Sequence, residues 1–135
     1  MLLEIDTRSE TPIYQQLCDQ IILGIARQEL AIGEMLPTVR QLADELGVNT
    51  MTISKAYNLL KDAGYLVTDR RKGSIVTQPL PFKESGRQDW EQRLALLLAE
   101  AKVRQLPKIE LETTVATIWQ TFEKEAEDPL AEQSD

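Results

Sequence analysis

The sequence predicts a mainly α-helical protein with one small β-hairpin, arranged as an N-terminal winged helix-turn-helix and a C-terminal two-helix region. Three observations support this fold class. Apolar residues recur at helical spacing in three segments before residue 64, a short turn separates the second segment from the third, and two β-prone stretches then flank a cationic turn. With 135 residues, the chain can bury a hydrophobic core of its own.

The first helix is expected to begin at Thr11 and Pro12, with the threonine as N-cap, and to run to about Gln28. Before it, Leu2–Ile5 has the composition of a short β-strand. The apolar residues that recur every four positions along this helix are Ile13, Leu17, Ile21 and Ile25. This spacing predicts one broad apolar face that packs into the core.

Two further helices follow, separated by a tight turn. Thr38 and Gln41 form a capping box at the start of the second helix, and Gly47 directly follows its last apolar residue. Asn49 can then cap a third helix, which Gly64 ends. The core-facing residues of the third helix are Ile53, Ala56, Tyr57 and Leu60. The short turn between these two helices is typical of a helix-turn-helix.

The opposite face of the third helix is polar. It carries Thr50, Ser54, Lys55 and Asn58, with Thr52 at its edge. Short hydrogen-bonding side chains with one cation can enter the major groove of DNA without steric conflict. We therefore expect this helix to read base edges in duplex DNA.

A cationic hairpin completes the N-terminal region. Residues 66–68 and 74–77 are β-prone, and the turn between them contains Arg70, Arg71, Lys72 and Gly73. This is the predicted wing. The winged helix-turn-helix is expected to span residues 1–77, and Pro79, Pro81, Ser85 and Gly86 mark a linker over residues 78–88.

Residues 89–127 are expected to form two helices, from Asp89 to Leu106 and from about Ile109 to Ala126, followed by a flexible acidic tail over residues 128–135. Two helices of this size cannot bury both apolar faces by themselves, so we expect a homodimer. The residues assigned to dimerisation are Trp90, Leu94, Leu97, Leu98, Ala101, Leu111, Val115, Ile118, Trp119 and Phe122.

Composition narrows the function further. The formal net charge is −7, but residues 38–76 hold six basic and four acidic residues, a net charge of +2. There is no histidine, which makes an enzyme or a metal site a poor fit, and no cofactor is expected.

The single cysteine, Cys18, excludes an intramolecular disulfide, and its apolar neighbours suit inert packing. No apolar run approaches the roughly 20 residues that span a bilayer, and no signal peptide is visible, so a cytoplasmic protein without a membrane partner is expected.

The N-terminal region resembles the GntR family of bacterial regulators, and the short two-helix C-terminal region resembles the YtrA subfamily. The stretches that carry this resemblance are Thr11-Pro12-Ile13-Tyr14-Gln15-Gln16, Gly33-Glu34-Met35-Leu36-Pro37-Thr38-Val39-Arg40-Gln41-Leu42-Ala43, Leu46-Gly47-Val48-Asn49-Thr50-Met51-Thr52-Ile53-Ser54-Lys55-Ala56-Tyr57, Leu60, Gly64-Tyr65-Leu66 and Lys72-Gly73-Ser74-Ile75-Val76. In the family, a Gly-x-Gly pair is common at the wing, and Arg71 stands here in place of the first glycine.

The resemblance implies a repressor of a nearby operon, often one that encodes a transporter, which binds an inverted repeat as a homodimer. It implies a phosphate contact from Arg40, and base or phosphate contacts from the start of the recognition helix: Asn49, Thr50, Thr52, Ser54 and Lys55. It also implies that Lys72 and Gly73, with Arg70 and Arg71 alongside, approach the minor groove.

Two alternatives stay open at this point. Winged helices also serve as protein-interaction modules without DNA. The aromatic residues Trp90, Trp119 and Phe122 could line a pocket at the dimer interface, in a regulator that responds to an unidentified small-molecule effector.

Overall fold

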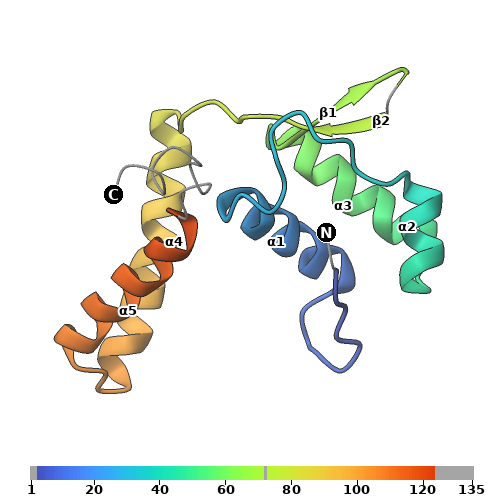
Figure 1. The fold of residues 1–135 in the computed structure, drawn as a ribbon. Coiled ribbons are helices and arrows are strands. Elements are labelled where there is room, and N and C mark those ends of the chain that lie inside the picture. The colour runs from blue at the N-terminus through green and yellow to red at the C-terminus, as the bar shows by residue number, and fades with distance from the viewer. Residues whose placement is uncertain (1–2, 72, 124–135) are drawn as a thin grey trace, which may run out of the picture. The chain divides into compact units, whose positions relative to one another are not determined.

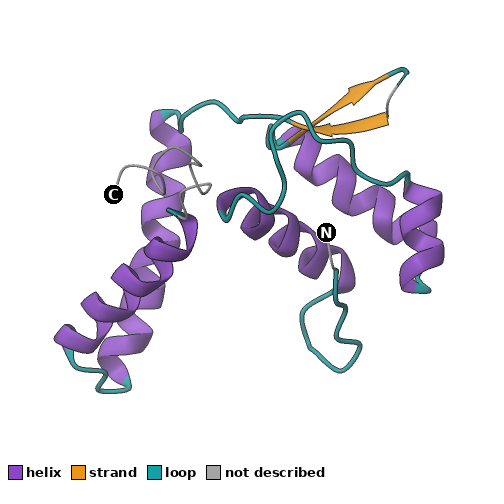
Figure 2. Ribbon diagram, viewed as in Figure 1, coloured by secondary structure: helices purple, strands orange, loops and turns teal. Residues whose placement is uncertain are grey.

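The computed structural model describes residues 3–71 and 73–123, and it divides the chain into two compact units, Met1–Leu80 and Pro81–Asp135. The first unit contains α1 (Ile13–Ala26), α2 (Val39–Leu46), α3 (Thr50–Asp62), β1 (Leu66–Asp69) and β2 (Gly73–Val76) (Figure 1). The second contains α4 (Glu84–Val103) and α5 (Lys108–Phe122) (Figure 2). The mainly helical fold with one small hairpin confirms the predicted fold class.

The core of the first unit forms around one face of α3. Ile53 and Ala56 are fully buried, and Tyr57 and Leu60 are nearly so. The other buried hydrophobic side chains come from α1, α2, the hairpin and the connecting loop: Leu17, Cys18, Ile21, Leu30, Leu36, Leu42, Ala43, Leu66 and Val76. Helix α3 packs on both α1 and α2 and also contacts β1. The spacing of apolar residues along α3 therefore fixes its rotation about its own axis.

Local capping sets where α2 and α3 begin. The Thr38 hydroxyl accepts a hydrogen bond from the backbone N–H of Gln41 (3.1 Å), and the Gln41 side chain accepts one from the backbone N–H of Thr38 (3.0 Å). Helix α2 ends at Gly47, whose φ of 66° is costly for any residue with a side chain. The Asn49 side chain then accepts from the backbone N–H of Met51 at 2.8 Å. The predicted helix-turn-helix is confirmed, cap by cap.

The N-terminal segment differs from the prediction in two ways. Pro12 is the N-cap of α1, and the Thr11 side chain does not cap it, because Pro12 has an extended backbone (ψ 147°). Residues 3–5 form no strand. Their surroundings offer side-chain partners instead of a neighbouring strand: Glu4 N–H donates to Gln20 Oε1 (3.0 Å) and Asp6 N–H donates to Gln16 Oε1 (2.9 Å).

The hairpin is anchored at its base. β1 and β2 pair antiparallel, with Leu66 opposite Val76 and Asp69 opposite Gly73. The loop before α2 runs along the outer edge of β2, where Leu36 N–H donates to the Ser74 carbonyl (2.8 Å) and Val76 N–H donates to the Glu34 carbonyl (2.9 Å). These bonds attach the hairpin to the body of the unit and leave its tip projecting.

The second unit is a pair of helices joined by a short turn at Gln105, which has a left-handed φ of 65°. Helix α4 begins at Glu84, earlier than the expected start at Asp89, because the proline-rich segment ends at Pro81 and a helix tolerates serine and glycine in its first turn. None of the residues of α4 or α5 is buried. Within the described ranges, no helix is long and apolar enough to cross a membrane.

We predict that Tyr57→Phe lowers the free energy of unfolding by about 1 kcal/mol, because it leaves a partly buried carbonyl without its donor. The Tyr57 hydroxyl donates to the carbonyl oxygen of Pro37 at 2.7 Å and so joins α3 to the segment before α2. Urea denaturation followed by circular dichroism measures the change. Tyr65→Phe is the matched control, since the Tyr65 hydroxyl bonds to no residue in the described chain. Equal losses in both variants would contradict this role.

The same hydroxyl makes stability depend on alkaline pH. Burial, and to a smaller extent the charge of Glu45, raises the pKa of Tyr57 from 10.0 to about 12. The unfolded chain therefore loses this proton first, so stability falls as pH rises through 10 toward 12. Tyr57→Phe should lack this part of the fall, which denaturation at a series of pH values would detect.

Candidate nucleic-acid interface

The outward face of α3 carries a shallow hollow of about 430 Å³. Its lining includes three of the predicted contact residues, namely Thr50, Ser54 and Lys55. Thr52 is half-buried at the edge of this face. Asn49 is exposed just before the helix, and its side-chain oxygen is occupied by the cap. Asn49 is thus first a structural cap, with its amide N–H₂ left to donate.

The hollow also contains residues that were not among the predicted contacts. Met51 and Leu59 are apolar and exposed, with 76% and 43% of their surface accessible, and Asn58 and Asp62 complete the lining. Met51 is the second residue of α3. An exposed methionine beside the polar residues Thr50, Ser54 and Lys55 is a signal that the sequence already contained.

Lys55 has a fixed partner on another helix. Its ammonium nitrogen lies 3.9 Å from the centre of the Tyr14 ring, on the first turn of α1. A cation over an aromatic face is attracted by the ring quadrupole, so the contact restrains the lysine without neutralising its charge. No spacing rule predicts a contact between residues so far apart in the chain, so sequence reasoning missed it.

Arg40 is the second residue of α2, and it is exposed. A pair with Asp44, one turn further along the helix, is a common way for a surface arginine to be neutralised. The arginine forms no ion pair with Asp44 or with any other residue in the described ranges. Its guanidinium is free to bind an anion.

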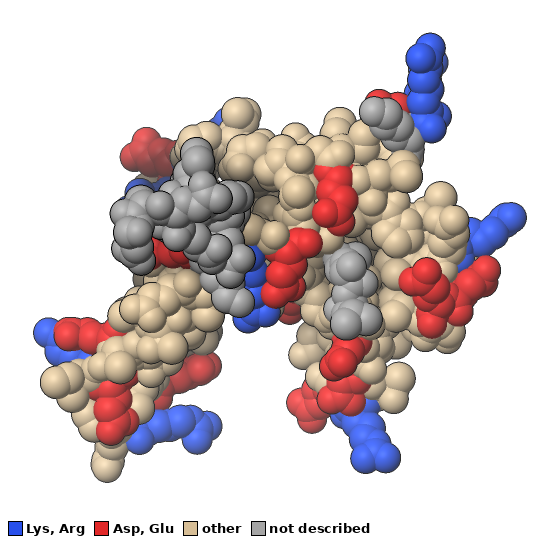
Figure 3. All heavy atoms as spheres, viewed as in Figure 1, with Lys and Arg blue, Asp and Glu red and all other residues tan. Residues whose placement is uncertain are grey.

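Cationic side chains project from the tip of the hairpin (Figure 3). Arg70 and Arg71 are both exposed there, and the Arg71 N–H donates to Asp69 Oδ1 at 2.8 Å. Gly73 begins β2 with a φ of 90°, which allows the tight turn. Lys72 lies outside the described residues, so its predicted contact stays a prediction.

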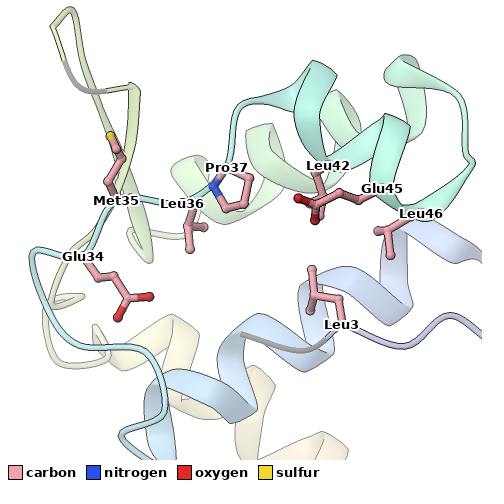
Figure 4. Close-up of a pocket in the computed structure, with 8 residues that line it drawn as sticks. All are labelled: Leu3, Glu34, Met35, Leu36, Pro37, Leu42, Glu45 and Leu46. Carbon is pink, nitrogen blue, oxygen red and sulfur yellow. The ribbon is translucent and has the colours of Figure 1, made fainter.

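A second hollow, of about 440 Å³, lies between the N-terminal segment, the loop before α2 and α2 itself (Figure 4). It is lined by Leu3, Leu36, Leu42 and Leu46, and its charged groups are the carboxylates of Glu34 and Glu45. An acidic lining repels phosphate, so this hollow does not belong to the candidate interface. The residues that the structure describes include no group of three or more acidic or cysteine side chains able to hold a metal ion.

On the second unit, the residues assigned to dimerisation are exposed or half-buried. An open apolar groove of about 510 Å³ is lined chiefly by Leu98, Leu111, Val115, Ala116 and Trp119. The aromatic residues do not form one cage: the Trp119 ring lies against Phe122 (5.9 Å between ring centres), whereas the Trp90 ring lies against Phe82 (6.1 Å). The Trp119 N–H donates to Glu123 Oε1 at 2.7 Å.

A capped helix-turn-helix with an exposed polar face, beside an anchored hairpin with a cationic tip, defines a winged-helix transcription regulator that binds DNA. Residues 13–76 match the family of bacterial regulatory proteins named gntR. The chain is 30% identical to the helix-turn-helix transcriptional regulator YhcF of Bacillus subtilis over 77% of its own length and 83% of that protein. The chain belongs to the GntR family, within its YtrA subfamily, and such proteins are regulators and not enzymes.

Three more similarities extend beyond the DNA-binding unit or name a function. The repressor YtrA of Bacillus subtilis is 36% identical over 77 residues, which span 57% of this chain and 59% of that protein. The solved structure of YtrA from Sulfolobus acidocaldarius, a GntR-family transcription factor, is 36% identical and covers 85% of this chain and 94% of that one, with a TM-score of 0.54. A Listeria monocytogenes structure described as a transcriptional antiterminator shares the fold, with a TM-score of 0.81 at 22% identity over 90% of this chain and 92% of that one.

We predict that Tyr14→Leu weakens DNA binding about threefold, because Lys55 loses the ring that restrains it. Tyr14→Phe keeps the ring and should bind like the unaltered chain. Lys55→Met should reduce the slope of log affinity against log salt by the amount that corresponds to about one phosphate contact. In a chain that already carries Tyr14→Leu, the same substitution should reduce this slope less. Fluorescence anisotropy at several salt concentrations measures all four. Additive losses in the double variant would show that Tyr14 does not act through Lys55.

Proposed function

We propose that this protein is a repressor that binds an inverted-repeat operator as a homodimer and blocks transcription of a nearby operon. The observation that carries the proposal is the outward face of α3, which is exposed and polar on a helix whose other face is buried in the core. Recognition helices of helix-turn-helix proteins enter the major groove in this orientation.

The proposal assigns roles according to the chemistry of each side chain. Arg40 and Lys55 are long cations that bind phosphates, which positions the protein without reading sequence. Thr50, Thr52 and Ser54 are short donors and acceptors that reach base edges, and Asn49 adds its amide N–H₂ beside its role as a cap. At the wing, Arg70, Arg71, Lys72 and Gly73 approach the flanking minor groove.

Repression is supported by the similarity to YtrA of Bacillus subtilis, which is named a repressor. The match spans 59% of that protein, so repression by this chain is a proposal. A bound dimer would exclude RNA polymerase from overlapping DNA. A transporter operon next to the gene is the target that the family resemblance suggests.

The homodimer is supported by the apolar surface of the second unit. Trp119 is 58% exposed, Val115 54% and Ile118 51%, and all three lie on α5 at helical spacing. Large contiguous apolar patches on a protein surface mark interaction sites, because their exposure to water costs free energy. The α4–α5 helix pair of a second copy offers a surface of the same chemistry. Two copies of the chain would present two α3 helices to an inverted repeat.

The alternatives have less support. A protein-interaction module has no use for exposed arginines on α2 and at the hairpin tip of an otherwise acidic chain. A small-molecule effector at the dimer interface stays a prediction, and the separation of the Trp90 and Trp119 ring contacts gives it no preformed aromatic cage.

Selection from random duplex DNA by the purified chain, followed by sequencing, tests the proposed function. At near-physiological salt, where non-specific binding is suppressed, we expect an inverted repeat whose half-sites are about one helical turn apart. Enrichment of a single unrepeated site would contradict the dimeric operator. No enrichment at all would contradict sequence-specific binding.

We further predict that Val115→Lys converts the protein to a monomer and weakens operator binding at least tenfold, because a buried unpaired charge opposes association. Thr114→Lys is the matched control, since Thr114 is exposed on α5 and lies outside the residues assigned to dimerisation. Light scattering gives the mass of each variant. A dimeric Val115→Lys, or a monomeric Thr114→Lys, would show that this face is not the interface.

A further inference from the structure

We infer that Met51 is a specificity-determining residue that recognises the methyl group of a thymine in the operator half-site. The inference deepens the proposed function and depends on it, since it names the base chemistry that α3 selects. It differs from the assignment above, in which polar side chains alone read the bases.

The exposure of Met51 is the first argument. With 76% of its surface accessible, it is among the most exposed large apolar side chains of the first unit, and it stands on a face whose neighbouring residues are polar. Exposure of an apolar side chain is unfavourable in water, so a helix that reads DNA gains affinity when this side chain is covered by an apolar group.

The position of Met51 is the second argument. It is the second residue of α3, and its own backbone N–H is held by the Asn49 side chain at 2.8 Å. The start of the helix, and with it the origin of this side chain, is therefore fixed. The N-terminal residues of a recognition helix are the ones that reach base edges, so Met51 lies where the DNA comes closest.

The chemistry of the hollow is the third argument. Met51 shares it with Ser54 and Lys55, which lie three and four residues further along the same helix face. Among the groups that bases present in the major groove, the thymine C5-methyl is the apolar one, and it distinguishes thymine from cytosine. The unbranched thioether of methionine can adapt its shape to a methyl group beside polar contacts.

Leu59 is the other exposed apolar residue of this hollow, but it does not share the position. It is 43% exposed and lies two turns nearer the C-terminus of α3, where a recognition helix no longer meets base edges. The structure therefore favours Met51 as the apolar reader.

Removal of single methyl groups from the DNA tests the inference directly. In the operator obtained by selection, each thymine is replaced in turn by uracil, which removes only the C5-methyl group. Binding of the full chain to each duplex is then measured by fluorescence anisotropy. We expect at least one position in each half-site where the unaltered protein binds about fourfold more weakly, the effect of losing one buried methyl group.

Variants of the protein show whether Met51 is responsible. Met51→Gln has similar length and helix propensity but a polar end, so the uracil penalty should disappear at that position. Met51→Leu should keep it. Met35→Gln is the matched control, the same change at another exposed methionine of this unit, and it should leave the penalty unchanged. Thermal melting followed by circular dichroism confirms that each variant folds.

The outcomes separate this inference from the proposed function. Binding to a selected operator in which no thymine is sensitive to uracil, or in which the penalty persists in Met51→Gln, overturns the role of Met51 and leaves the repressor intact. A half-site without thymine overturns it as well. Failure to select any operator overturns the proposed function itself.

Discussion

The burial of one face of α3 is the constraint on which the rest of the structure depends. Ile53, Ala56, Tyr57 and Leu60 enter the core together, and α1, α2 and β1 all pack around them. Because these four residues leave α3 no freedom to rotate, the polar residues between them must face outward. The same packing that stabilises the unit therefore presents the DNA-reading surface, and no separate device is needed to orient it.

The electrostatics of the chain complement this arrangement. A net charge of −7 disfavours non-specific attraction to nucleic acid, so affinity must come from a few well-placed cations. Arg40 is unpaired among the described residues, Lys55 is restrained by Tyr14 while it keeps its charge, and Arg70 and Arg71 extend from an anchored hairpin. The DNA affinity of an acidic protein with a few local cations depends more on a correctly shaped binding site than the affinity of a uniformly basic protein does. This dependence favours discrimination between DNA sequences.

Local rules allowed much of this fold to be predicted. The capping box at Thr38, the left-handed Gly47 and the Asn49 cap act within a few residues, and the sequence contains all of the information that they need. The predicted strand before α1 failed because two glutamine side chains, Gln16 and Gln20, supply the hydrogen bonds that a neighbouring strand would have supplied. The contact between Lys55 and Tyr14, and the separate ring partners of Trp90 and Trp119, depend on tertiary packing, so no spacing rule could predict them.

Disulfide cross-linking to DNA tests most directly whether the outward face of α3 enters the major groove. The one natural cysteine, Cys18, is 5% exposed, and burial raises its pKa, so an introduced Ser54→Cys supplies the reactive thiol. The operator carries a thiol tethered to a base either in the major groove or in the minor groove. If the outward face of α3 enters the major groove, Ser54→Cys cross-links rapidly to the major-groove tether alone, and the exposed control Ser9→Cys does not cross-link. Cross-linking of Ser54→Cys to the minor-groove tether, or to neither tether, would contradict the entry of this face into the major groove.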